Sequence, residues 1–124
     1  MIIKNDLEVQ QVLKFIESNE ILAFDNETTG LNVRKDIVIG FGISNAVEGF
    51  YIAHKAYKNG KLHKLVSSNA CCSILTALLN KKLLMFNGSF DIRFTKNYFG
   101  VDLTNALYSE VMLLKHTVAE ERPF

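Results

Sequence analysis

The chain has 124 residues, of which 48% are hydrophobic and 22% are charged. This size and balance are typical of a single soluble globular domain, so no second core is expected. The net charge of +1 excludes a global electrostatic attraction to nucleic acid. No apolar run approaches the roughly 18 residues of a membrane span, and residues 1–6 do not resemble a signal peptide. We therefore expect a cytoplasmic protein without a membrane partner.

The first elements expected are a helix and a short buried strand. Asn5 or Asp6 is suited to cap the helix, which ends at residues 18–20. Its apolar positions recur near helical spacing and are Leu7, Val9, Val12, Leu13, Phe15 and Ile16. The apolar run 21–24 then predicts a β-strand that ends in a polar turn.

Two carboxylates, Asp25 and Glu27, follow this strand with one residue between them. Strand side chains alternate between faces, so both carboxylates are expected to point into the same small volume. Two unit charges about 4 Å apart repel by roughly 4 kcal/mol at an effective dielectric near 20, and a divalent cation relieves such repulsion. Mg²⁺ or Mn²⁺ suits a site with only oxygen ligands. The alternative interpretation is a solvated strand end that binds nothing.

Two strands and a basic segment are predicted next. Residues 37–44 and 49–53 read as strands, and the turn between them is too short for a parallel crossover, so they pair antiparallel. Residues 54–64 contain four lysines, two histidines and no acid, and they read as a loop. Such a loop either lies along a phosphate backbone or is simply a solvated surface.

Helices and short strands alternate in the second half of the chain. A helix is expected at 71–80, and the adjacent Cys71 and Cys72 in it are expected to be reduced. Its buried face is predicted to consist of Ile74, Leu75, Leu78 and Leu79. An apolar strand at 83–86 follows.

The last elements expected begin with a helix that carries Asp91 in its first turn and ends at Gly100. Residues 101–103 are expected to form a short strand and 105–118 a final helix. The predicted fold class is therefore α/β, with helices packed on a mixed sheet.

Three segments of the chain together resemble a known family. Phe24-Asp25-Asn26-Glu27-Thr28-Thr29-Gly30-Leu31 after an apolar strand is similar to the first motif of the DEDD-type 3′–5′ exonucleases. Residues 83–91, which end in Asn87-Gly88-Ser89-Phe90-Asp91, resemble the second motif. Residues 108–124 give a softer match to the segment that follows it. The resemblance is to the proofreading domains of family A, phage-like DNA polymerases.

The resemblance implies a ribonuclease H-like fold. That fold would have a mixed sheet of three antiparallel strands plus one or two further strands, with flanking helices. The whole chain, 1–124, would form a single partial exonuclease-like domain that lacks the C-terminal helices of the family. The implied partners are a single-stranded DNA 3′ end, with RNA as another substrate class, and the remainder of a DNA polymerase or a downstream polypeptide.

The family's catalytic roles carry over to matching positions only. Asp25 would bridge two Mg²⁺ or Mn²⁺ ions, Glu27 would hold the ion that activates water, and Asp91 would serve the second ion. Thr28 and Leu31 match positions that contact the terminal nucleotide, and Asn87 would lie near the scissile end. The structural alternatives are that residues 28–30 form only a turn and that Leu31 belongs to the core. Asn87 could equally be an ordinary turn residue, and Asp91 could serve only to interact with the helix dipole.

The family's third motif, a Tyr or His followed by the last catalytic Asp, has no match in this chain. The spare acids Asp102, Glu110, Glu120 and Glu121 lie outside that sequence context, as do the three histidines, His54, His63 and His116. We therefore expect weak metal occupancy and slow or absent turnover from these 124 residues alone. The predicted function is metal-dependent release of nucleoside 5′-monophosphates from DNA 3′ ends, and the alternative is a non-catalytic binding or interaction module.

Overall fold

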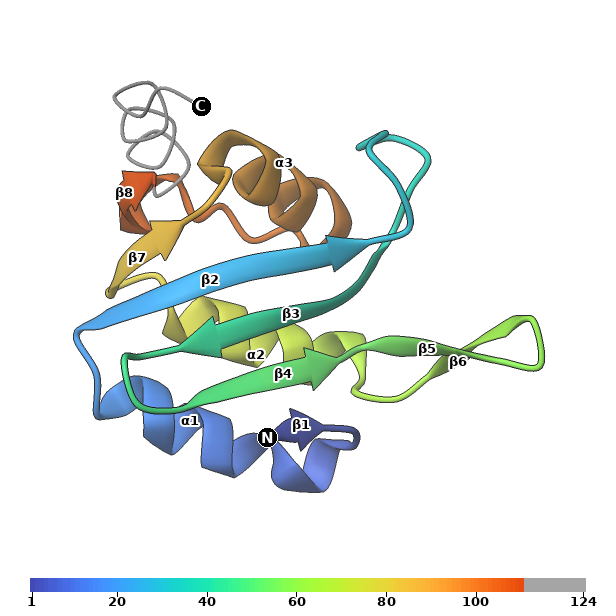
Figure 1. Cartoon of the computed structure of the whole chain (residues 1–124), viewed down its shortest axis with the longest axis horizontal. Coiled ribbons are helices and arrows are strands. Elements are labelled where there is room, and N and C mark those ends of the chain that lie inside the picture. Colours follow the sequence, from blue (N-terminus) through green and yellow to red (C-terminus); the bar gives the residue numbers. More distant parts are fainter. Residues whose placement is uncertain (111–124) are drawn as a thin grey trace, which may run out of the picture.

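The computed structural model describes residues 1–110 and contains a six-stranded mixed sheet with three helices (Figure 1). The strand order across the sheet is β1-β4-β3-β2-β7-β8. The sheet strands are β1 (Ile2–Ile3), β2 (Ile21–Thr28), β3 (Val38–Ser44), β4 (Gly49–Ala53), β7 (Lys82–Met85) and β8 (Leu107–Glu110). The helices are α1 (Val9–Glu17), α2 (Ser68–Ala77) and α3 (Gly88–Phe99), with 3₁₀ turns at Asp6–Glu8 and Thr104–Ala106. A separate two-stranded ribbon consists of β5 (Lys55–Lys58) and β6 (Lys61–Lys64).

The three central strands form an antiparallel unit, as the short connections predict. β3 lies between β2 and β4 and is antiparallel to both, whereas β1, β7 and β8 join the sheet in parallel pairings. β2 and β4 therefore run in the same direction, and their C-terminal ends lie at the same edge of the sheet. Figure 1 shows the β5–β6 ribbon extending outward from this edge.

All three described helices cover the same face of the sheet. The Phe15 ring of α1 packs against Phe50 of β4, and the Phe99 ring of α3 packs against Phe41 of β3. α2 contacts both α1 and α3. The main core lies between these helices and the sheet. Within the described part of the chain, no helix is long and apolar enough to cross a membrane.

β2 is longer than predicted, and the alternation of its side chains between the two faces of the sheet positions the candidate site. The expected strand ended at Phe24, but β2 continues to Thr28 because residues 23–28 pair with β3. Leu22, Phe24 and Asn26 are buried on the helix side, whereas Asp25 and Glu27 are exposed on the opposite face. The carboxylates thus lie within the strand and not after it.

Near the N-terminus, the opening helix begins later than predicted. Residues 6–8 form a 3₁₀ turn, and Leu7, expected in the apolar stripe, is 93% exposed. Asp6 does not cap α1; its carboxylate accepts the backbone N–H of Ser67. β1 was not predicted, because a two-residue strand carries no periodic signal.

Several other expectations were wrong in detail. Residues 54–64 are not a loop, since most of them form the β5–β6 ribbon. Residues 101–103 form no strand, and the helix expected at 105–118 is contradicted at 107–110 by β8, which pairs with β7. Leu79 is 43% exposed and not part of the buried face of α2.

Candidate metal and nucleic-acid site at strand β2

Asp25 and Glu27 project from the face of the sheet opposite the three described helices. They occupy positions i and i+2 of β2, as expected for two side chains that share a face. Burial, followed by the charge of Glu27, raises the pKa of the Asp25 carboxyl above its ordinary value. The two negative charges therefore act on one another, which agrees with the interpretation from the sequence.

Asp91 approaches β2 from α3, at the point where β7 ends. The last residue of β2 that pairs with β7 is Phe24, opposite Met85. Beyond it, the Asp91 Oδ1 takes the place of a neighbouring strand and accepts the backbone N–H of Asn26 at 3.1 Å. This bond holds the carboxylate beside the residue that separates Asp25 from Glu27.

The second oxygen of the Asp91 carboxylate has no hydrogen-bond partner among residues 1–110. Asp91 is 2% exposed, and its Oδ2 is buried without a hydrogen bond. Burial raises the pKa of Asp91 to about 7, the Asn26 N–H lowers it, and the charge of Asp25 raises it further. A buried, unsatisfied carboxylate oxygen is costly unless a proton or a cation meets it.

Asn26 fixes α3 to β2 and was not singled out from the sequence. Its side-chain amide donates to the Asp91 carbonyl at 3.1 Å and to the Thr95 Oγ1 at 2.9 Å. Asn26 and Thr95 are both buried. A polar residue in the middle of an apolar strand was the available signal, because buried amides need partners.

Tyr51 of β4 lies beside Glu27 and was also missed. Gly40 of β3 is paired with Glu27 of β2. A Cβ at Gly40 would collide with the Tyr51 hydroxyl. The Tyr51 ring therefore lies over Gly40 and reaches the Glu27 carboxylate. Burial, followed by the charge of Glu27 and hydrogen bonding to it, raises the pKa of Tyr51 to about 12.

The loop after β2 is an ordered, hydrogen-bonded turn. The Thr28 Oγ1 donates to the Gly30 carbonyl at 2.7 Å, and the Thr29 Oγ1 donates to the Asp36 carboxylate at 3.0 Å. A Cβ at Gly30 would lie 2.5 Å from Asp36 Oδ2, so a larger residue here would displace the Asp36 carboxylate. Leu31 is 84% exposed, which contradicts its interpretation as a core residue.

Two further features of the site are Asn87 and a hollow on the face of the sheet that carries Asp25. Asn87 is exposed and precedes α3, where its carbonyl accepts the Asp91 N–H at 3.0 Å. The hollow, of about 640 Å³, adjoins Asp25 and Tyr51. Its other lining residues are predominantly apolar and include Ala23, Leu84 and Phe86.

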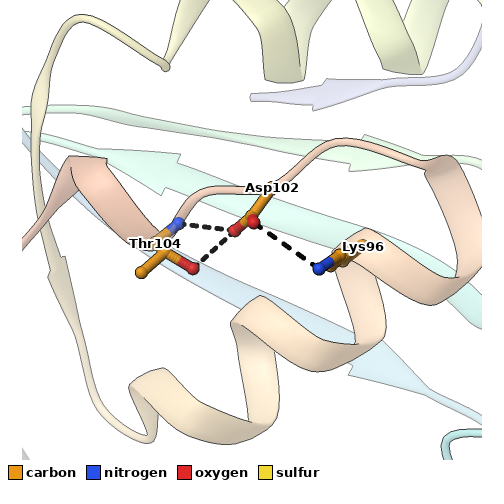
Figure 2. A network of polar contacts seen from close by, with 3 residues as sticks. All are labelled: Lys96, Asp102 and Thr104. Atoms are coloured by element: carbon orange, nitrogen blue, oxygen red, sulfur yellow. Dashed lines mark hydrogen bonds and ion pairs between the residues drawn. The ribbon is translucent and has the colours of Figure 1, made fainter.

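Asp102, the spare acid that the structure describes in full, is engaged elsewhere. Figure 2 shows its carboxylate accepting hydrogen bonds from the backbone and the hydroxyl of Thr104 and pairing with Lys96 at 3.7 Å. These contacts lower the pKa of Asp102. The side chain of Glu110 lies outside the described residues, as do Glu120, Glu121 and His116.

The carboxylates fit a divalent cation but do not already form a closed site. Within residues 1–110, no group of three acidic, His or Cys side chains is gathered closely enough to hold a metal ion. The Glu27 carboxylate is hydrogen-bonded to Tyr51. The unpaired Asp91 Oδ2 beside Asp25 nevertheless offers a hard oxygen ligand, which is the type that Mg²⁺ and Mn²⁺ prefer.

Several solved structures share this fold. The chain is similar to the exonuclease domain of Aedes aegypti Nibbler, with 15% identity, a TM-score of 0.67, and coverage of 95% of this chain and 55% of that one. It is similar to the catalytic core of Trypanosoma brucei RRP6, with 14% identity, a TM-score of 0.68 and coverage of 92% and 29%. It is also similar to Escherichia coli RNase D, an exoribonuclease, with 16% identity, a TM-score of 0.61, and coverage of 84% of this chain and 26% of that one. The chain therefore spans little more than half of the Nibbler domain and less than a third of the other two.

No curated protein sequence matches the chain significantly. The model of a protein family described as 3′–5′ exonuclease, in contrast, matches residues 1–120. Both the mixed α/β architecture and the ribonuclease H-like fold agree with that match. The chain belongs to the 3′–5′ exonuclease family.

Proposed function

We propose that the chain is the metal-binding part of a 3′–5′ exonuclease that hydrolyses phosphodiester bonds at DNA 3′ ends and releases nucleoside 5′-monophosphates. The observation that supports this most directly is the Asp91 Oδ2, which lies beside Asp25 and is buried without a hydrogen-bond partner among residues 1–110. We further propose that the domain serves proofreading and acts together with the remainder of a DNA polymerase.

The carboxylates of Asp25, Glu27 and Asp91 would hold the cations. A pair of Mg²⁺ or Mn²⁺ ions, when bound, supplies an activated water and stabilises the leaving oxygen. Asp91 is kept in place by the Asn26 N–H, so its free oxygen points to a fixed position. The Asp25 carboxylate interacts electrostatically with both Glu27 and Asp91, and it is therefore suited to bind both cations.

The surroundings of the carboxylates would receive the 3′ end. Leu31 exposes its side chain at the turn after β2, where it is available to pack against the terminal base. The Thr28 hydroxyl is engaged with Gly30, which leaves the backbone of this turn to contact the nucleotide. Asn87 is exposed at the start of α3, one helical turn before Asp91.

Hydrolysis of single strands with Mn²⁺ or Mg²⁺ tests the proposal. Because slow turnover is expected from these 124 residues alone, the chain is used in excess over the substrate. DNA and RNA oligonucleotides with a 5′ label should then shorten stepwise from the 3′ end, and a blocked 3′ end should prevent this. Asp25→Asn should abolish the reaction, whereas Asp102→Asn should retain it because Asp102 pairs with Thr104 and Lys96. Equal digestion by wild type and Asp25→Asn would refute the assignment.

Two further results would change the proposal. Shortening of RNA but not of DNA would reassign the substrate and remove the proofreading role. Tight binding of single strands and Mn²⁺ without any shortening would favour the second candidate, a non-catalytic nucleic-acid-binding module.

A further inference from the structure

The β5–β6 ribbon carries a concentration of positive charge. Its Lys55 Nζ lies 5.9 Å from the centre of the Tyr98 ring. Hydrogen bonding from Ser67 lowers the pKa of Asp6, and the charge of Lys64 contributes to this. Four of the chain's 14 basic residues lie within residues 55–64, which contain no acid. In the part of the chain that the structure describes, the ion pairs are Lys82–Glu20 and Lys96–Asp102, and neither involves the ribbon. The lysine charges of the ribbon are therefore not neutralised by an ion pair within residues 1–110.

Pairing in the ribbon places like charges opposite each other. Lys55 faces Lys64, and Lys58 faces Lys61. Directly opposed like charges destabilise an antiparallel pair, and an isolated two-stranded ribbon is only marginally stable in water. The lysines thus weaken the element that carries them, and a polyanion would relieve the repulsion.

A tyrosine–leucine pair lies between the two lysine pairs along the ribbon. Tyr57 faces Leu62, and the two side chains are 63% and 38% exposed. Alternation along the strands places them on the same face as Lys55 and Lys64. An exposed aromatic ring flanked by cations is the combination that binds single-stranded nucleic acid, because bases stack on the ring and phosphates meet the charges.

The base of the ribbon is fixed to the body. The buried His54 Nδ1 donates to the Val66 carbonyl at 2.7 Å, and the Tyr98 hydroxyl lies 3.2 Å from its Nε2. The Leu65 N–H donates to the His54 carbonyl at 2.9 Å, which closes the base of the ribbon. The ribbon consequently has a defined direction relative to the sheet.

The ribbon begins near the carboxylates of β2. Glu27, Gly40 and Ala53 form one row across the sheet, and the ribbon begins two residues after Ala53. Adjacent strands are about 4.8 Å apart, so the strand that leads into the ribbon lies roughly 10 Å from β2. Figure 1 shows the ribbon leaving the edge of the sheet at which β2 ends.

We propose that the β5–β6 ribbon binds the backbone and a base of single-stranded nucleic acid whose 3′ end lies at the carboxylates. Tyr57 stacks on a base, and Lys58 and Lys61, which alternation places on the opposite face, contact phosphates where the nucleic acid passes the tip of the ribbon. This inference names the strand-binding surface of the proposed exonuclease and in that respect depends on the proposed function, although binding to the ribbon does not itself require the carboxylates.

Binding of fluorescent single-stranded DNA and RNA in EDTA, measured by anisotropy with the full chain, tests the inference. Lys58→Glu is the informative change, because the new Glu faces Lys61 and should leave the melting temperature equal or higher. Binding should nevertheless weaken at least about threefold, and the slope of log K against log salt should fall by about 0.7 for the lost contact. A gain in stability together with a loss of binding is not expected from a merely structural lysine.

Two further variants complete the test. Tyr57→Ser should weaken binding by roughly 5- to 150-fold, the range that corresponds to the loss of one base–aromatic stack. Lys14→Glu, the matched control, reverses an exposed charge on α1 and should change affinity less than twofold. A loss confined to DNA or to RNA would support the inference and identify the bound polymer.

The inference would be overturned by unchanged binding in both ribbon variants, by an equal loss in Lys14→Glu, or by no binding of wild type to either polymer at low salt. Failure here is distinguishable from failure of the proposed function. If hydrolysis requires Asp25 but the ribbon variants bind single-stranded nucleic acid normally, only the inference about the ribbon is refuted. If the chain does not hydrolyse nucleic acid but the ribbon variants lose binding, the inference about the ribbon is supported and the proposed function is not.

Discussion

The Asp91 carboxylate accepts the backbone N–H of Asn26, the residue that separates the two acids of β2. One hydrogen bond of 3.1 Å therefore links the second sequence motif to the first, across 65 positions of the chain. The bond uses one oxygen of the carboxylate and leaves the other buried without a partner. The expected effects of Mn²⁺ and of Asp91→Asn follow from that asymmetry.

Mn²⁺ should raise the melting temperature of the chain, because an ion that binds only the folded state stabilises it by mass action. At a concentration 100 times its Kd, the gain is about 2.7 kcal/mol. Thermal unfolding with and without millimolar Mn²⁺ measures the shift. Asp25→Asn and Asp91→Asn should lose it, and Asp102→Asn should keep it; a shift that survives in Asp91→Asn would place the ion elsewhere.

Asp91→Asn should stabilise the metal-free protein at pH 8. The folded-state pKa of about 7 exceeds the ordinary value of 3.8, so the folded protein holds this proton more tightly than the unfolded chain. The resulting stability is present below about pH 4 and is lost as the pH rises to about 7. Asparagine stays neutral and avoids that loss. Melting in chelator at pH 5 and pH 8 should show a variant advantage that grows with pH; an advantage independent of pH would contradict this cause.

Gly40→Ala should destabilise the chain by about 1–3 kcal/mol, the usual range for overpacking. The new Cβ would collide with the Tyr51 hydroxyl and lie 2.8 Å from the Ile52 carbonyl oxygen. Gly42→Ala is the matched control on the same strand, because its Cβ would meet nothing nearer than 4.0 Å. Urea unfolding compares the two. Similar losses in both variants would show that strand glycine itself, and not the Tyr51 contact, sets the stability.

Stability should fall as the pH drops below about 6.5 because of His54. Burial lowers the pKa of His54 from its ordinary value of 6.5, so the unfolded chain takes up this proton at a higher pH than the folded protein. The contribution of neutral His54 is thus complete above pH 6.5 and is lost toward acid. His54→Gln should show a shallower decline in melting temperature from pH 7 to pH 5. His63→Gln, on the exposed ribbon, should follow the wild type, and a decline equally steep in all three proteins would exclude His54 as its source.

The local patterns around the motifs predicted much of the site. The apolar run before Asp25 predicted β2, and the i, i+2 spacing predicted that Asp25 and Glu27 share a face. Gly100 predicted the end of α3, and it has the left-handed conformation, with φ of 78°, that glycine adopts readily. These features depend on a few neighbouring residues, which is why the sequence alone contains them.

Features that depend on pairing between distant strands were not predicted. Tyr51 meets Glu27 only because the register of β4, β3 and β2 places Gly40 between them. β8 replaced the start of a predicted helix because it pairs with β7, and such tertiary pairing overrides local propensity.

The ribbon, in contrast, had a local signal. Asn59 and Gly60 both have positive φ, of 53° and 77°, and an Asn-Gly pair between two strands is a strong hairpin signal. The prediction of a loop at residues 54–64 was based on their basic composition and did not use this turn signal.

The alternation along β2 has a consequence for how the site and the fold depend on one another. Leu22 and Phe24 face the core from one side of the strand, and Asp25 and Glu27 extend from the other. A slip of one residue in its pairing with β3 would exchange the two sets, burying both acids and exposing the apolar side chains. Misaligned chains would therefore pay a penalty in stability and lose the cation ligands together. Selection for a foldable strand is at the same time selection for a correctly oriented pair of acids.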